Sequence, residues 1–110
     1  MKLPNAEASI VEIEKLRDYC LSPQHPRGRH KARVFLSLLG LAVADAMELR
    51  AALLHAALTE NAVPGASDRF GTRYILDFEL RRGGRSAQIR SCWIVLDSEI
   101  APRFVTCYIL

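Results

Sequence analysis

The spacing of apolar residues divides the chain into a helical first part and a strand-rich second part. In the first part apolar side chains recur about every three to four residues, which is the period of an amphipathic helix. Ser22-Pro23 ends one such pattern and Gly40 ends the next, because proline disfavours helix in the residue before it and glycine readily terminates a helix. The pattern predicts three helices, over residues 14–21, 29–39 and 43–60.

Each predicted helix has an apolar face that we expect to contact the core. These faces are Ile13, Leu16, Tyr19 and Cys20 in the first helix, Val34, Phe35, Leu38 and Leu39 in the second, and Met47, Ala51, Leu54 and Leu58 in the third. In the third helix Ala46, Leu49, Leu53 and Ala57 widen the stripe. A stripe this wide predicts burial on two sides, either in a central core helix or in a helix that self-associates.

The second part of the chain changes to a period of two, which is typical of half-buried strands. A loop over 61–68, containing Pro64-Gly65, precedes it. Gly83-Gly84 predicts a hairpin turn, and residues 97–102 predict a second turn. The predicted strands are 73–81, 86–96 and 103–110, with the β-branched segment 8–13 as an additional edge strand. We therefore expect an α+β fold in a single domain, 1–110: three N-terminal helices packed on a C-terminal antiparallel β-meander of three to four strands.

Composition agrees with a globular domain and indicates the cellular compartment in which we expect it. The chain has 110 residues, half of them apolar, and a net charge of +3 from 15 Lys and Arg against 12 Asp and Glu. This excess is mild, and selection for solubility explains it as well as anion binding does. Cys20, Cys92 and Cys107 lack disulfide or zinc spacing, so we expect buried free thiols. With no signal-peptide pattern and no transmembrane stretch, we expect a cytoplasmic protein without a membrane partner.

Basic residues are concentrated in one short run, His25 to Arg33, at the expected start of the second helix. Unpaired N–H groups and the positive end of the helix dipole also point there, which favours binding of an anion such as RNA phosphate. His25 or His30 would serve as acid or base. The expected phosphate ligands are Arg27, Arg29, Lys31 and Arg33. The alternative is an ordinary solvated basic loop.

The last predicted strand is the second candidate for chemistry. Phe104, Thr106 and Tyr108 alternate with an apolar set, so we expect their face to lie on the open side of the sheet. Depending on register, either Ser91 and Trp93 or Arg90 and Cys92 would stand beside them. The alternative is that Trp93 and Tyr108 are core aromatics. No nucleotide-binding glycine loop or metal-ligand spacing is present, so we expect neither a cofactor nor a metal.

Two segments together resemble a known family. The segment from Tyr19 to Phe35 contains His25-Pro26-x-Gly28-x-x-Lys31-Ala32, and the chain ends in Thr106-x-Tyr108. Over nearly the whole chain this pattern resembles a bacterial domain-of-unknown-function family, DUF6883. More distantly, the helices-then-sheet architecture is similar to the barnase–EndoU–colicin–RelE group of metal-independent toxin ribonucleases. The resemblance marks His25, Gly28, Lys31, Arg103, Thr106 and Tyr108.

The ribonuclease resemblance implies a mechanism in which an RNA 2′-OH attacks its own phosphate and leaves a 2′,3′-cyclic phosphate. Lys31 and Arg103 would hold the phosphate, and Thr106 and Tyr108 would position the substrate. No histidine lies on the predicted strands, so an Arg, Lys or Tyr must be the second proton-transfer group. The expected partners are RNA and a cognate antitoxin or immunity-like protein, bound by a monomer or homodimer.

Two other functions fit the same residues. One is a non-catalytic binding module of a two-gene bacterial system, which contacts a protein or nucleic acid through its basic loop. The other is a structural role, in which His25 caps the loop, Gly28 supplies a positive φ and Lys31 pairs with a carboxylate. The ribonuclease predicts that the basic run and Thr106/Tyr108 meet in one cleft, the module predicts an exposed basic run, and the structural role predicts a buried one.

Overall fold

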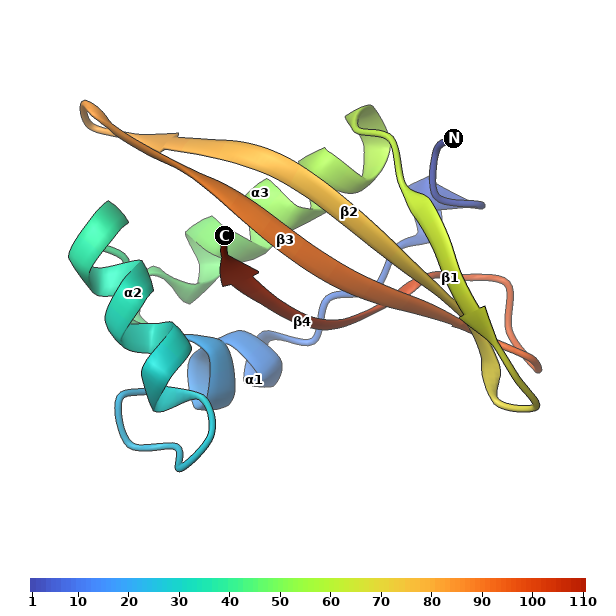
Figure 1. The fold of residues 1–110 in the computed structure, drawn as a ribbon, viewed down its shortest axis with the longest axis horizontal. Helices are drawn as coiled ribbons and strands as arrows, with labels where there is room; N and C mark the ends of the chain where they lie inside the picture. The colour runs from blue at the N-terminus through green and yellow to red at the C-terminus, as the bar shows by residue number, and fades with distance from the viewer.

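The computed structural model describes residues 1–110 and confirms the expected α+β architecture, with helices followed by an antiparallel sheet (Figure 1). The helical segments are η1 (Ala6–Ala8), α1 (Ile13–Lys15), η2 (Leu16–Cys20), α2 (Arg29–Leu39), η3 (Val43–Asp45) and α3 (Ala46–Thr59). The strands are β1 (Val63–Ser67), β2 (Gly71–Arg82), β3 (Arg85–Leu96) and β4 (Arg103–Ile109). None of the helices is long and apolar enough to span a membrane.

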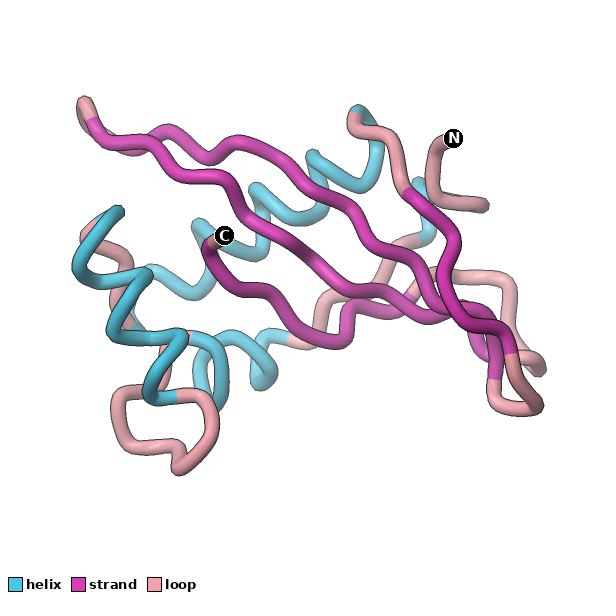
Figure 2. Tube along the Cα trace, viewed as in Figure 1, coloured by secondary structure: helices cyan, strands magenta, loops and turns pink.

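The four strands pair in chain order, β1-β2-β3-β4, and every pair is antiparallel. The long β2–β3 hairpin turns at Gly83 and Gly84, which both have positive φ. Helix α3 passes behind β2 and β3 in Figure 2, and α2 stands beside the C-terminal end of β4. Because β4 is an edge strand, its free side faces the helices rather than another strand. This edge is where the candidate site forms.

Two predictions about edge structure were wrong. The expected loop over 61–68 contains β1, an exposed strand that pairs irregularly with β2. Pro64, which has no backbone N–H to donate, lies in it, and an edge strand tolerates this because one side of its backbone is unpaired. Residues 8–13 form no strand and contribute only an isolated parallel bridge between Ile10 and Arg103.

Helix faces were predicted only in part. In α2 the buried residues are Ala32, Phe35 and Leu39, whereas Val34 and Leu38 are 39% and 48% exposed. In α3 the expected central stripe is largely exposed. The helix buries the residues that were expected to widen this stripe, together with Ala56: Ala46, Leu49, Leu53, Ala56 and Ala57. The helix is apolar nearly all round, so periodicity alone does not select its inner face. Alanines on that face allow the backbone to approach its neighbours closely.

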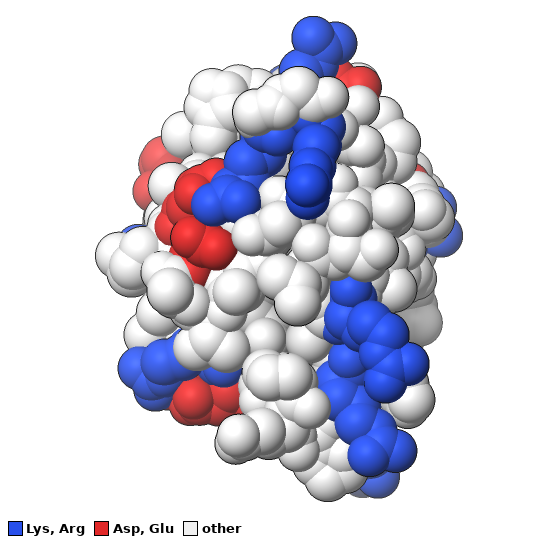
Figure 3. Space-filling model, turned by 90° about the vertical axis from the view of Figure 1, so that its left-hand side faces the viewer, with Lys and Arg blue, Asp and Glu red and all other residues white.

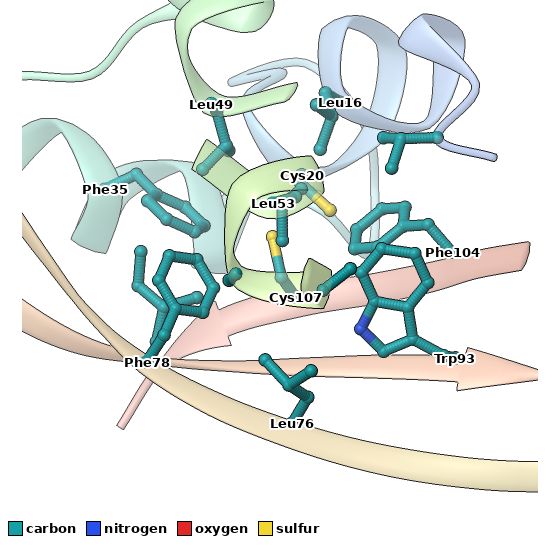
Figure 4. Packing of buried hydrophobic residues seen from close by; sticks show 14 of the residues in the cluster. Leu16, Cys20, Phe35, Leu49, Leu53, Leu76, Phe78, Trp93, Phe104 and Cys107 are labelled. Carbon is teal, nitrogen blue, oxygen red and sulfur yellow. The ribbon is translucent and has the colours of Figure 1, made fainter. Parts of the chain in front are cut away.

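The core lies between the helices and the inner face of the sheet. Trp93 packs edge-on against Phe104 with ring centroids 5.6 Å apart, and both side chains are buried (Figure 4). Phe35 of α2 and Phe78 of β2 fill the other end of the core. Cys20 and Cys107 are free and buried there, as expected (Figure 4), whereas Cys92 is free but only half-buried.

Candidate functional site

Lys31 is the centre of a polar cluster that joins η2, α2 and β4. Its ammonium group donates to the Tyr19 hydroxyl at 3.0 Å and to Thr106 Oγ1 at 3.2 Å. The same nitrogen lies 4.7 Å from the Tyr19 ring centroid and 5.8 Å from that of Tyr108, which are cation–π distances. No carboxylate pairs with it. The cluster therefore holds a positive charge that no carboxylate of the chain neutralises.

The loop before α2 is ordered by His25. Its Nδ1 accepts hydrogen bonds from the backbone N–H groups of Arg27 and Gly28, both at 3.0 Å. These bonds require a lone pair on Nδ1, so the hydrogen of the neutral ring is on Nε2. The imidazole also packs edge-on against Tyr19, with ring centroids 4.7 Å apart. His25 thus caps the loop and supports the tyrosine that holds Lys31.

Gly28 has a steric role, and the expected positive φ was wrong. Its φ is −75°, which any residue adopts. A Cβ at this position would lie 2.1 Å from the backbone oxygen of Tyr19. Only glycine lets the loop approach η2 closely enough for His25 to reach the Tyr19 ring.

A shallow pocket of about 350 Å³ opens beside the cluster. His30, Lys31, Val34, Tyr108 and Ile109 line it, so it lies between α2 and the end of β4. His30 is exposed, and Tyr108 is half-buried. The pocket therefore combines an imidazole, a phenol and an ammonium group on a surface that a ligand can reach.

The register of β4 decides which residues stand beside Thr106 and Tyr108. Cys92 pairs with Thr106 and Arg90 with Tyr108, which selects one of the two expected arrangements. Arg90 also forms two hydrogen bonds to Asp77, both at 2.9 Å. Asp77, and to a smaller degree Tyr108, raise the pKa of Arg90 above its already high value. Arg90 is therefore a neutralised cation that lies next to the Tyr108 phenol.

An irregularity in the β3–β4 pairing overturns the expected alternation along β4. The register shifts opposite Cys92 and Trp93, so Phe104 faces the core although Thr106 does not. Ser91 and Trp93, the other expected neighbours of Thr106 and Tyr108, do not stand beside them, and both are completely buried. The Trp93 indole N–H donates to Ser91 Oγ, and that hydroxyl donates to the Leu76 carbonyl. Their polar atoms are used within the core.

Cys20 lies on the buried side of the cluster. Its sulfur is 3.7 Å from Thr106 Oγ1. Hydrogen bonding from Cys107, with smaller contributions from Thr106 and the Lys31 charge, lowers the pKa of Cys20 to about 6 despite burial. The pKa of Cys107 is raised well above its usual value by the same hydrogen bond and by burial. Cys20 is thus a buried thiol of lowered pKa that lies beneath Thr106, on the side of the cluster away from solvent.

Arg103 does not reach this site, contrary to expectation. It forms two hydrogen bonds to Glu99, at 2.7 and 2.9 Å, and lies 3.7 Å from Glu12. At about 3.3 Å per residue, its backbone is roughly 16 Å from that of Tyr108 along β4. It links β4 to the turn before it, and its charge is neutralised.

The arginines of the basic run also lie apart from Lys31. Arg29 and Arg33 line a different groove, on the opposite side of α2, and Arg27 is exposed on the loop. None of the three guanidinium groups forms an ion pair or a hydrogen bond to another residue. From the α2 side, basic atoms at the height of α2 and its loop form a column with no acidic atoms beside it (Figure 3). The run therefore divides between two surfaces.

Three members of the cluster were not among the sequence candidates. Tyr19 was assigned to a helix face, although it begins the segment that carries the family pattern. Cys20 was expected only as a core thiol. Arg90 was one of two alternatives that depended on register. The sequence offered a signal only for Tyr19, the aromatic residue at the start of the family segment. Assigning Cys20 and Arg90 to the cluster required knowledge of the strand pairing.

Comparisons with known proteins agree with this fold. A family model described as Domain of unknown function (DUF6883) matches residues 2–110. No curated protein matches. A chain of the solved contact-dependent growth inhibition toxin–immunity protein complex from Klebsiella pneumoniae 342 aligns with a TM-score of 0.71 and 17% identity, covering 92% of this chain and 99% of that chain. At this identity the likeness establishes a shared fold.

Proposed function

The chain belongs to the family described as Domain of unknown function (DUF6883), and we propose that it is a toxin-like endoribonuclease that cleaves RNA without a metal ion. The observation that carries the proposal is the Lys31 ammonium, which has no carboxylate partner and lies beside the pocket lined by His30 and Tyr108. A cation held by hydroxyls and aromatic rings keeps its charge available for an anionic ligand. A phosphodiester with an adjacent hydroxyl is a substrate for these three groups.

The proposed reaction is an internal transesterification. His30 accepts the proton of a ribose 2′-hydroxyl, and the 2′-oxygen forms a bond to the adjacent phosphorus. The bond from phosphorus to O5′ breaks, and the Tyr108 hydroxyl donates its proton to O5′. The products are a 2′,3′-cyclic phosphate and a 5′-hydroxyl. Solvent returns the proton from His30 to Tyr108 between turnovers.

Lys31 has the electrostatic role in this scheme. Negative charge increases on the phosphate oxygens as the 2′-oxygen attacks, and a fixed ammonium group stabilises that charge without reorganising. Tyr19 and Thr106 hold the ammonium group in place. Arg90, whose side chain is held by Asp77, lies beside Tyr108 and donates a hydrogen bond to the phenolate that remains after proton donation. His25 is a positioning residue, because its Nδ1 is used in capping the loop.

The fold likeness supports a toxin-type role and suggests a protein partner. The similar chain comes from a complex of a growth inhibition toxin and an immunity protein. We therefore propose that this chain also has a cognate antitoxin or immunity-like protein. RNA is the proposed substrate because the site carries cationic and proton-transfer groups.

The first test is incubation of the purified chain with total bacterial RNA in excess EDTA. We expect discrete fragments with 2′,3′-cyclic phosphate ends. His30→Gln should reduce the rate by about 100-fold or more, as is usual for a general base. Lys31→Met should have a similar effect, because a preorganised cation contributes a comparable factor.

His55 provides a matched control, because it is an exposed helical histidine on α3, outside the pocket. His55→Gln should keep full activity. Equal losses for His30→Gln and His55→Gln would contradict the assignment. A folded wild-type chain that leaves the RNA intact would exclude the reaction and favour the second function.

The second candidate is a non-catalytic binding module that uses the basic loop. It is favoured by the exposed Arg27 side chain, which has no partner within the chain. For this function, Arg27→Gln should weaken capture of the partner, and Lys31→Met should have little effect. The two functions therefore predict opposite rankings of the same two variants.

A further inference from the structure

A groove on the far side of α2 is the clearest feature that the proposed reaction does not use. It has a volume of about 370 Å³, and most of its lining is apolar. Leu21 and Leu41 form a buried floor, and Leu36 and Val43 stand at the rim, 55% and 37% exposed. Exposed apolar surface of this kind, bordered by polar residues, is typical of a site for a protein partner.

Two arginines on successive turns of α2 border the same groove. Arg29 and Arg33 are four residues apart, which places them on one face of the helix. Neither guanidinium group forms an ion pair or a hydrogen bond within the chain. The surrounding sequence has no carboxylate to offer, since no Asp or Glu occurs between Asp18 and Asp45. The groove therefore combines apolar contact area with two positive charges that lack a counter-charge.

The groove is separate from the Lys31 pocket. An α-helix turns by about 100° per residue, so Lys31 lies about 200° around α2 from Arg29. The lining residues agree, because no residue borders both the groove and the pocket. A ligand in the groove would leave the pocket of His30 and Tyr108 open.

We propose that this groove docks a segment of a partner protein that carries an aliphatic anchor flanked by carboxylates. The anchor would contact Leu21, Leu36 and Leu41, and the carboxylates would pair with Arg29 and Arg33 as planar, bidentate partners. An amphipathic helix laid in a groove presents groups with this spacing. RNA fits less well, because no aromatic ring lines the groove to stack a base.

The test is selection of a random peptide display library on the immobilised full chain. Enriched peptides should combine aliphatic residues with Asp or Glu. Their affinity should fall tenfold or more for the double variant Arg29→Gln/Arg33→Gln and for Leu36→Glu. Leu38→Glu is the matched control, because Leu38 is similarly exposed on α2 but does not line the groove. That variant should bind the peptides within about twofold of wild type.

Three results would overturn the inference. One is a selection that enriches no peptide or only peptides without acidic residues. Another is an equal loss of affinity in Leu36→Glu and Leu38→Glu. The third is that the affinity for a labelled RNA oligonucleotide falls as much in Arg29→Gln/Arg33→Gln as in Lys31→Met. Peptide selection does not depend on RNA cleavage, so this inference and the proposed function fail or hold separately.

Discussion

Replacing Gly28 with alanine tests whether the His25 loop is held against η2 by direct backbone contact. A Cβ at this position would lie 2.1 Å from the Tyr19 carbonyl oxygen and 2.8 Å from its carbon. Both are backbone atoms, so the contact cannot be relieved by rotating a side chain. The loop or η2 must move by about an ångström. Overpacking of this kind costs about 1–3 kcal/mol.

The movement also weakens hydrogen bonds at both ends of the loop. Gly28 N–H donates to His25 Nδ1, and the Gly28 carbonyl accepts the first backbone bond of α2 from Ala32. Each bond contributes about 1 kcal/mol, so we expect a total loss near the upper end, about 3 kcal/mol. For 110 residues, an unfolding entropy of about 2.1 cal/mol/K per residue converts this to a fall in Tm of roughly 13 K.

Thermal unfolding followed by circular dichroism measures the change in Tm, and the sign of that change tests the steric explanation. Without the contact, alanine would stabilise the chain, because φ at this position suits any residue and alanine loses less entropy on folding. Gly65→Ala is the matched control, since its nearest atom would be at an ordinary 3.5 Å. An unchanged or raised Tm in Gly28→Ala, or an equal fall in Gly65→Ala, would refute the steric explanation.

Three further predictions concern residues around the cluster. The pKa of Cys20 is lowered to about 6 from the usual 9.0, so the contribution of this thiol to the free energy of unfolding should be complete above pH 9 and disappear as the pH falls through about 6. The free energies of unfolding in urea of wild type and Cys20→Ser should therefore diverge with rising pH. Cys92→Ser should not show this divergence. Thr106→Val removes one acceptor of the Lys31 ammonium at nearly constant volume, so the free energy of unfolding measured in urea should fall by about 1 kcal/mol. An unchanged free energy of unfolding would mean that the hydrogen bond from Lys31 to Thr106 is not formed. Arg82→Gln should lower Tm, because this guanidinium donates to the carbonyls of Leu39, the last residue of α2, and of Gly40, which follows it, at 3.2 and 2.9 Å, and also pairs with Glu48. The exposed Arg81→Gln should not lower Tm, and equal effects would contradict a role of Arg82 in holding the end of α2.

Much of the fold follows from local sequence signals. Gly40 has the left-handed φ expected of a residue that ends a helix, and α2 spans the residues that the periodicity predicts. Gly83-Gly84 turns the long hairpin at the expected position. These features depend on neighbouring residues, so one sequence contains the information. The edge strand β1 was missed because pairing with β2, rather than its own composition, makes it a strand.

The site was harder to predict because it depends on contacts between distant segments. The residues His25, Lys31 and Thr106 could be selected from the family pattern, but the hydroxyl of Tyr19 that holds Lys31 could not be anticipated from spacing. The single irregularity in the β3–β4 pairing decides which side of β4 meets solvent. Such an irregularity has no signature in a strand of alternating residues, and it removed Trp93 from the candidate site.

The division of the basic run has a simple geometric origin. Alternate positions in an α-helix point to nearly opposite sides. Lys31 therefore turns toward β4 while Arg29 and Arg33 turn toward the apolar groove. The clustering of basic residues indicated an anion site, but the helix divides this cluster between two surfaces with different neighbours. This separation would allow the proposed catalytic pocket and the proposed docking groove to share one helix.

The most direct test of the central claim is cleavage of a short RNA with a single 2′-deoxy substitution at the mapped cleavage position. The reaction is run in excess EDTA with enzyme in excess, beside the all-ribose RNA. We expect the all-ribose RNA to be cut to a 2′,3′-cyclic phosphate, Lys31→Met to nearly abolish this cleavage, and the deoxy position to stay intact. Cleavage of both RNAs at the same rate would contradict an attack by the 2′-hydroxyl and the site built around Lys31.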